Sequence, residues 1–188
     1  MPLEQLPVLP VVILCGGQGT RMQGATTTKK ELVEIGGRPI LWHVMKIYAV
    51  YGHAHFILTL GHEAEAIKRY FLDYRPMGSD FTIPLGQADA VAYHKPSAEE
   101  NWRVTLADTG LDTHKGSRIY RVARYINVDT FFVTYGDGVS DIDLDALLSF
   151  HLHHGRLATI TGVHPRSQYG VLETDRHDQV IGFGEKPK

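Results

Sequence analysis

The sequence predicts an α/β fold in which a mostly parallel sheet carries helices on both of its faces. Short apolar runs rich in β-branched residues alternate with helical segments along most of the chain, which favours parallel strands joined by crossover helices. Two of the three strongest strand candidates end in glycine-rich sequence, and ligands of such sheets bind beyond the carboxyl ends of the strands. With 188 residues, of which 43% are hydrophobic, the chain is long enough for one domain with a substantial core.

The first half of the chain begins with a loose, proline-containing lead-in over residues 1–10. The apolar run after it is β-branched and ends in glycines, which is typical of a buried parallel strand. Pro39 suits the first turn of the next helix, and Gly52 suits its end. The expected elements are a strand over 11–15, a helix over 39–51, a strand over 55–60, a helix over 63–72 and strands over 81–84 and 104–107.

The second half of the chain continues this alternation. The residues over 131–135 form a third buried apolar run, and it ends at Gly136 and Asp137. The expected elements are a helix over 117–125, a strand over 131–135, a helix over 144–153, a strand over 158–163 and a late hairpin over 171–173 and 180–183. No repeat or linker divides the chain, so we expect residues 11–188 to form a single domain.

Composition excludes several classes of protein. Nineteen Lys and Arg against 21 Asp and Glu give a net charge of -2, which predicts no nucleic-acid partner. The longest apolar stretch, over residues 8–15, is far shorter than the ~20 residues of a membrane span, and the N-terminus lacks the positive start of a secretory signal. A single cysteine excludes an internal disulfide framework and a cysteine-based zinc cluster. We therefore expect a cytoplasmic, globular protein without membrane attachment.

A glycine-rich loop follows the first strand. Gly16, Gly17 and Gly19 lie within four positions and let the backbone approach a ligand closely, with N–H groups that can point at phosphate oxygens. Thr20 adds a hydroxyl donor, and Arg21 adds a planar, permanently charged fork that suits phosphate. The spacing matches neither common phosphate-binding loop, and an ordinary strand-to-helix turn is the alternative.

Lys30 and Asp137 are the next candidates. Lys30 lies close enough along the chain to fold over the same anion, although paired lysines in a loop are usually exposed to solvent. Asp137 stands between two glycines at a strand end, and a single carboxylate with phosphate oxygens commonly holds Mg²⁺. An Asp-Gly turn is the alternative for this position. The acidic residues that follow fit the start of the next helix better than a metal site; they are Asp141, Asp143 and Asp145.

In combination these motifs resemble the sugar-1-phosphate nucleotidylyltransferases. That family carries G-G-x-G-T-R near its N-terminus, a lysine some ten residues later, G-D after a central strand and E-K-P downstream. The resemblance covers residues 11–188 and is greatest to the glucose-1-phosphate cytidylyltransferases. The segments that carry it are 16–21, 33–43, 101–110, 134–141 and 185–187.

The resemblance implies a Rossmann-like nucleotidyltransferase fold and the transfer of CMP from CTP to glucose 1-phosphate, a hexose 1-phosphate, with Mg²⁺ as cofactor. It implies catalytic roles for Arg21 and Lys30 and a metal-binding role for Asp137. Residues implied to bind the nucleotide are Gly16, Gly17, Gly19, Thr20, Arg21, Thr113, Arg118 and Gly136. Glu185 and Lys186 are implied to bind the sugar phosphate, although a solvated tail is the alternative there. Family members assemble into oligomers, which implies a homo-oligomer.

Two features depart from the family pattern. The family's P-K-P is replaced by Lys29-Lys30-Glu31, in which we expect Glu31 to pair with Lys30 and compete for its charge. The family continues for tens of residues after E-K-P and supplies a second Asp to the metal there, so the resemblance implies a chain short of that part with weaker Mg²⁺ binding. The alternative functions are a nucleotide-binding homologue with little turnover and a transferase for another nucleotide or sugar phosphate.

Overall fold

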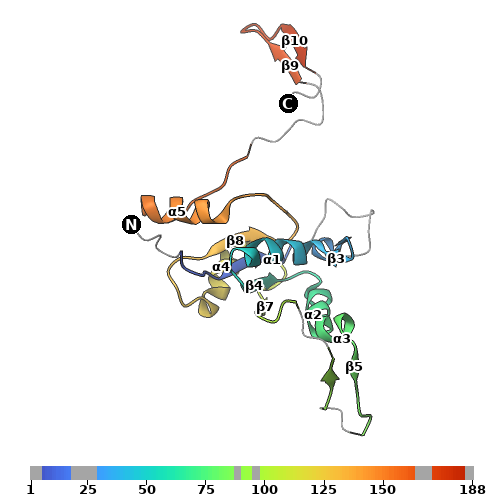
Figure 1. Cartoon of the computed structure of the whole chain (residues 1–188). Helices are drawn as coiled ribbons and strands as arrows, with labels where there is room; N and C mark the ends of the chain where they lie inside the picture. The colour runs from blue at the N-terminus through green and yellow to red at the C-terminus, as the bar shows by residue number, and fades with distance from the viewer. Residues whose placement is uncertain (1–5, 18–28, 87–89, 95–97, 164–170, 185–188) are drawn as a thin grey trace. The chain divides into compact units, whose positions relative to one another are not determined.

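The computed structural model confirms the α/β class (Figure 1). It describes residues 6–17, 29–86, 90–94, 98–163 and 171–184. The chain divides into two compact units, residues 1–149 and residues 150–188. The first unit contains the parallel sheet and every described residue on which the candidate site depends.

Four parallel strands form the central sheet. They are β1 (Val11–Leu14), β4 (His55–Leu60), β7 (Arg103–Asp108) and β8 (Phe132–Tyr135). Their spatial order is β7-β4-β1-β8, so the chain moves outward in one direction from β1 and then returns to place β8 on the other side. This reversal creates a topological switch point between β1 and β8, where α/β sheets place their ligands.

Helices cover both faces of this sheet, as the sequence predicts. Alternate residues of β1 point to opposite faces: Val11 and Ile13 belong to one buried cluster, and Val12 belongs to another. The first cluster packs against α1 and α2, and the second packs against α4. These helices are α1 (Ile40–Val50), α2 (Ala64–Leu72) and α4 (Lys115–Val122).

Shorter elements connect or extend this framework. Three antiparallel pairs form, β2 with β3, β5 with β6 and β9 with β10, and the last confirms the predicted late hairpin. The remaining bounds are η2 (Lys30–Leu32), β2 (Glu34–Ile35), β3 (Arg38–Pro39), α3 (Tyr74–Gly78), β5 (Phe81–Thr82), β6 (Ala92–Tyr93), η3 (Ala123–Tyr125), α5 (Leu144–His154), β9 (Val171–Thr174) and β10 (Val180–Gly184).

One strand prediction is wrong, and another is confirmed only in part. Residues 158–163 form no strand, and Ile160 within them is 90% exposed. The predicted strand over 81–84 is reduced to β5, which pairs with β6 outside the parallel sheet. Both segments have an apolar, β-favouring composition, but a strand also needs a neighbour for its backbone hydrogen bonds, and that requirement is tertiary.

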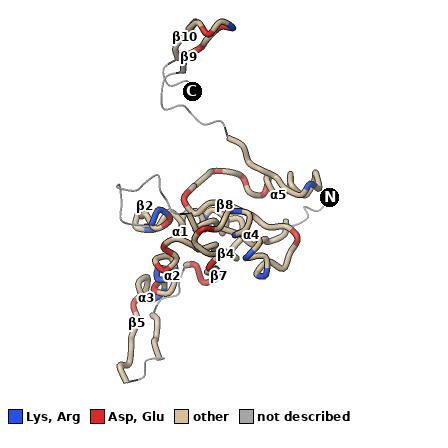
Figure 2. Tube along the Cα trace, turned by 180° about the vertical axis from the view of Figure 1, so that it is seen from behind, with Lys and Arg blue, Asp and Glu red and all other residues tan. Residues whose placement is uncertain are grey.

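Hydropathy and the distribution of charge can be followed along the described residues. No helix among the described residues is long and apolar enough to cross a membrane. Figure 2 shows basic and acidic residues interspersed along the described trace. This mixture does not have the one-sided basic character that favours nucleic-acid binding.

His53 is expected to make the stability of the folded chain depend on pH. Its Nδ1 accepts a hydrogen bond from the backbone N–H of Leu9 at 3.1 Å, and the ring packs on Phe132 with centroids 4.8 Å apart. Burial lowers the pKa of His53 from its ordinary value of 6.5, and Asp145 offsets part of this effect. Below pH 6.5 the unfolded chain therefore binds the proton more strongly than the folded chain does, and the free energy of unfolding falls as the pH decreases.

We expect His53→Gln to flatten this dependence, because the amide keeps an acceptor oxygen but does not titrate. The measurement is urea unfolding at several pH values between 7.5 and 5.5. The exposed His114→Gln variant is the matched control, with a wild-type slope. Equal slopes for His53→Gln and wild type would assign the pH dependence to other groups.

Candidate functional site

Two of the predicted motifs meet at the switch point of the sheet. Gly16 follows β1, and Gly136 and Asp137 follow β8, the strand that pairs with β1. The two strand ends remain joined beyond the ladder, because the N–H of Gly136 donates to the carbonyl of Leu14 at 3.2 Å. Residues 120 positions apart in the chain are thereby brought to the edge where a ligand of this fold would bind.

Close packing beneath this edge explains the glycine at 136. A Cβ on Gly136 would lie 2.7 Å from Sγ of Cys15 and 3.0 Å from Cγ of Glu31. Burial and the nearby Glu31 raise the pKa of the Cys15 thiol, so this cysteine is a neutral core residue. The carboxylate of Asp137, in contrast, belongs to an exposed residue. Asp137 is thus an accessible acid next to the packed floor of the site, by which we mean the buried side chains of Cys15 and Glu31.

A buried ion pair forms part of that floor. The Lys29 Nζ lies 3.6 Å from Oε2 of Glu31, with 3% and 10% of the two side chains exposed. The same Nζ donates to the carbonyl of His62 at 2.8 Å. Burial raises the pKa of Glu31 from its ordinary value of 4.5, and Lys29 lowers it in part. The expected pairing of Glu31 with Lys30 is therefore wrong, because the partner is Lys29.

Lys30 and Thr113 occupy positions close to these groups. Lys30 begins the short helix η2 and is only partly buried, so its charge is more accessible than that of Lys29. The Thr113 hydroxyl accepts a hydrogen bond from Nη1 of Arg121 at 3.0 Å, just after the carboxyl end of β7. Lys30 thus adjoins the buried Lys29–Glu31 pair along the chain, and Thr113 lies in the segment that follows β7.

Arg118 is 5% exposed, and its guanidinium contacts protein rather than solvent. It donates to four backbone carbonyls and one hydroxyl, and desolvation is the main cause of its lowered pKa. The acceptors are the carbonyls of Gly16, Leu60, Gly110 and Leu111 and the hydroxyl of Thr109. Of the predicted nucleotide-binding residues, Gly16 and Arg118 are thus in direct contact.

Several predicted residues lie outside the part of the chain that the structure describes. These are Gly19, Thr20, Arg21, Glu185 and Lys186. Gly17 is exposed at the start of the loop, and a Cβ there would meet no described atom within 4 Å. Among the described atoms, none crowds Gly17, and such space is the requirement for a close approach of ligand to backbone.

Sequence reasoning missed the buried partners of these motifs. Three consecutive charged residues at 29–31 resemble a solvated loop, and charged side chains are rarely buried unless paired. The pairing of Lys29 with Glu31 leaves no separate signal in the sequence. Nor does the sequence mark Thr109 and Gly61, whose positions are explained only by the guanidinium they surround.

The other acids are consistent with their predicted role at a helix start. Asp143 accepts a hydrogen bond from the N–H of Ala146 at 2.9 Å, which is the geometry of an N-cap before α5. Among the described residues, no group of three or more His, Cys, Asp or Glu could hold a metal. Asp137 is the exposed carboxylate that directly follows β8 at the switch point.

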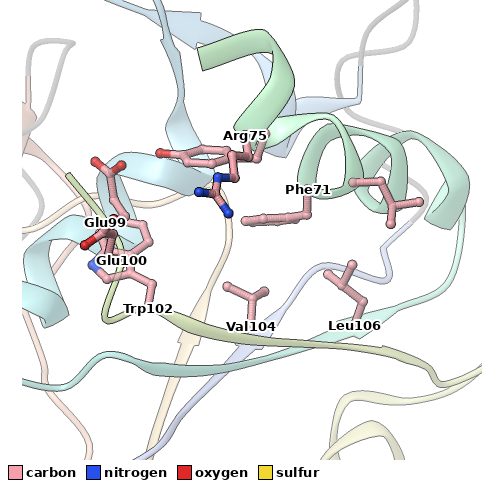
Figure 3. Close-up of a pocket in the computed structure, with 9 residues that line it drawn as sticks. Phe71, Arg75, Glu99, Glu100, Trp102, Val104 and Leu106 are labelled. Carbon is pink, nitrogen blue, oxygen red and sulfur yellow. The ribbon is translucent and has the colours of Figure 1, made fainter. Parts of the chain in front are cut away.

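A separate cavity of about 500 Å³ lies beside α2, α3 and β7 (Figure 3). Aromatic and aliphatic side chains line it, together with Arg75 and two glutamates, Glu99 and Glu100. Trp102, Val104 and Leu106 of this lining belong to the segment 101–110, but none of the predicted catalytic, nucleotide-binding, sugar-phosphate-binding or metal-binding residues lines the cavity. The candidate site remains the edge at the switch point.

Comparisons with known proteins find relatives over nearly the whole chain. A family model described as nucleotidyl transferase matches residues 10–188. The chain is 45% identical over 182 residues to glucose-1-phosphate cytidylyltransferase of Salmonella typhimurium, covering 96% of this chain and 70% of that protein. It is 44% identical over 168 residues to a probable glucose-1-phosphate cytidylyltransferase of Bacillus subtilis, covering 89% of this chain and 65% of that protein.

A solved structure provides a comparison of the fold alone. HddC from Yersinia pseudotuberculosis superposes with a TM-score of 0.60 at 23% identity, covering 96% of this chain and 70% of that chain. The resemblance that the motifs predicted is confirmed by the matches in sequence, and the α/β class is confirmed by the sheet and by this neighbour. The chain is a member of the nucleotidyl transferase family.

Proposed function

We propose that this chain transfers CMP from CTP to glucose 1-phosphate, giving CDP-glucose and pyrophosphate. The observation that carries the proposal is that Gly16 and Gly17, the described start of the glycine loop, lie at the same sheet edge as Gly136 and Asp137, at the switch point. The choice of nucleotide and sugar rests on the relatives that are 44–45% identical and are named for this activity.

The roles of the residues follow from charge and position. The backbone N–H groups of the loop over 16–21 would hold the triphosphate, with Arg21 supplying a charge-assisted contact. Lys30, which is more accessible than Lys29, would neutralise charge on the phosphates. Thr113 and Gly136 would lie against the nucleotide, and Glu185 with Lys186 would bind the sugar phosphate.

The reaction asks little covalent work of the protein. An oxygen of the sugar phosphate forms a bond to the α-phosphorus of CTP, and the bond from that phosphorus to the bridging oxygen breaks. The electron pair of the broken bond leaves with pyrophosphate. Positioning and charge neutralisation therefore account for the rate. The backbone N–H groups of the loop would position the phosphates, and the fixed cationic side chains would neutralise their charge.

The residues present fit a Mg²⁺ ion that is bound mainly through the substrate. Mg²⁺ usually keeps several waters and takes one or two carboxylates together with phosphate oxygens. Asp137 supplies one exposed carboxylate at the correct edge, and the described residues contain no all-protein cage. When bound, Mg²⁺ would neutralise negative charge on the phosphates.

The first test is pyrophosphate release from the 188-residue chain with CTP, glucose 1-phosphate and Mg²⁺. We expect Arg21→Ala to weaken CTP binding by about tenfold or more, because a charge-assisted hydrogen bond is lost. Arg69→Ala is the matched control, since this exposed arginine pairs with Glu65 on α2. CTP binding and turnover should be unchanged in that control.

Each outcome of this test is informative. CTP binding without pyrophosphate release would indicate a nucleotide-binding homologue without turnover. Stronger binding of UTP, dTTP or GTP than of CTP would indicate a transferase for another nucleotide. Unchanged affinity in Arg21→Ala would contradict the assignment of the loop as the phosphate cradle.

A further inference from the structure

The guanidinium of Arg118 joins the carboxyl ends of three neighbouring strands. Its Nη1 donates to the carbonyl of Leu60, the last residue of β4, at 3.0 Å. Nη1 also donates at 2.8 Å to the carbonyl of Gly110, which lies just beyond β7. Nη2 donates to the carbonyl of Gly16, beyond β1, at 3.0 Å. One side chain from α4 therefore fixes the edge on which the proposed site is built.

Two glycines make room for this guanidinium. A Cβ on Gly61 would lie 2.6 Å from Nη1 of Arg118 and 2.8 Å from the carbonyl oxygens of Gly16 and Gly110. A Cβ on Gly16 would collide with the guanidinium as well. Glycine is thus required after these strands because the Arg118 guanidinium occupies the space that a side chain would take.

The terminal N–H groups of this guanidinium are directed at acceptors within the protein. Each terminal nitrogen carries two N–H bonds. Nη2 directs its two at the carbonyls of Gly16 and Leu111, and Nη1 shares its two among three acceptors. A phosphate could be reached by these terminal N–H bonds only if one of the protein acceptors were given up. Arg118 is therefore arranged to hold backbone, not to present its fork to a ligand.

The consequence for the loop follows from the planarity of the peptide bond. In a trans peptide the carbonyl of one residue and the N–H of the next point in opposite directions. The Gly16 carbonyl faces Arg118 and also accepts from the N–H of His62 at 3.4 Å. The N–H of Gly17 must then point away from Arg118. A Cβ on Gly17 itself would meet no described atom within 4 Å.

We propose that Arg118 is a positioning residue that fixes the Gly16–Gly17 peptide so that the Gly17 N–H faces the phosphates of the nucleotide. This role rests on the proposed function, because it assumes a phosphate ligand at the loop. It differs from the direct contact with the nucleotide that the family resemblance implies for Arg118. A planar fork with fixed donors suits the role, and a lysine ammonium cannot reproduce its geometry.

The experiment combines two measurements on the same variants of the full 188-residue chain. Amide hydrogen exchange over residues 12–17, 59–62 and 108–112 reports the order of the strand ends in the absence of ligand. Titration calorimetry with CTP reports affinity for the folded protein. Arg118→Lys keeps the charge and loses the fork. Arg124→Met is the matched control, because this exposed arginine at the end of the same helical segment packs over Tyr125.

We expect Arg118→Lys to lose both the order of the strand ends and affinity for CTP. In Arg118→Lys the three segments exchange faster without ligand, and the Kd for CTP rises by about tenfold to a hundredfold, the range typical of groups that orient a binding residue. Arg124→Met leaves both quantities at wild-type values. Weaker CTP binding with unchanged exchange would overturn the proposal in favour of direct contact. Faster exchange with unchanged affinity would overturn it in favour of a purely structural role.

Gly61→Ala gives an independent test that keeps the arginine. The added methyl group would meet both the guanidinium and the carbonyl oxygens of Gly16 and Gly110 that it holds, so the same loss of order and of affinity is expected, and wild-type exchange and affinity in this variant would overturn the proposal even if Arg118→Lys does not fold. Failure of the proposed function is distinguishable, because it is seen in the wild type. A wild-type chain that binds none of CTP, UTP, dTTP and GTP would refute the proposed function and the positioning role together, whereas wild-type binding retained in Gly61→Ala would refute only the latter.

Discussion

Asp137→Asn is expected to lower pyrophosphate release by about a hundredfold or more and to raise the Mg²⁺ concentration needed for half-maximal activity. Asn has nearly the same shape as Asp but is uncharged and a weaker ligand for a hard cation. Asp137 follows β8 at the switch point and is exposed to solvent. The substitution therefore leaves the packing of Cys15 and Glu31 beneath Gly136 intact. The expected loss is therefore one of chemistry and not of folding.

Asp141→Asn is the matched control for this prediction. Asp141 is an exposed acid four residues further along the same segment, before α5 begins. It carries the same charge, so long-range electrostatic effects of the two substitutions are similar. The measurement is initial rate against Mg²⁺ concentration for both variants. A wild-type Mg²⁺ dependence in Asp137→Asn, or a loss confined to Asp141→Asn, would move the metal to another group.

The sequence predicts the framework of the fold because its signals are local. The apolar runs of β1, β4 and β8 differ clearly from the helical segments between them, and the glycines mark where strands end. The alternation then requires a parallel sheet, which brings the ends of distant strands to one edge. The sequence therefore predicts that the glycines after β1 and β8 lie at one edge, and the pairing of these two strands brings Gly16 and Gly136 there.

The remainder depends on contacts that the sequence does not encode locally. The segment 158–163 has the composition of a buried strand, yet pairing with a neighbour decides whether a strand forms. Arg118 is bonded to the carbonyl of Gly16, which lies 102 positions away, and no spacing reveals that acceptor. Family resemblance identified Arg118 as important for the site, and only the geometry suggests that it acts through the backbone.

Lys29 and Lys30 show the same limit in adjacent residues. The sequence offers two lysines and an acid in succession, and the family motif selects Lys30 for catalysis. The structure buries Lys29 and Glu31 as a pair and leaves Lys30 partly exposed. Substitutions of the two lysines should therefore affect different properties of the protein. Lys30→Met is expected to lower turnover, with a change in the free energy of unfolding within about 0.5 kcal/mol.

Lys29→Met is expected to lower the free energy of unfolding by about 3 kcal/mol, because Glu31 is left buried without its counter-charge. Glu31 has a pKa raised by burial, and removal of Lys29 raises this pKa further. An acid whose pKa is higher in the folded state than in the unfolded state favours folding at low pH, and that contribution is lost as the pH rises above 4.5 toward the folded-state value. The loss in Lys29→Met should therefore be larger at pH 8 than at pH 5.

Urea unfolding of Lys29→Met at these two pH values, with Lys30→Met as the matched control, measures this difference. A double substitution of Lys29→Met with Glu31→Leu removes both charges and fills the site with apolar groups of similar size. It should recover most of the stability, since a buried ion pair replaced by packed apolar side chains is often neutral or stabilising. Equal losses at pH 5 and pH 8 would show that Lys29 stabilises the fold through its bond to the His62 carbonyl and not through Glu31.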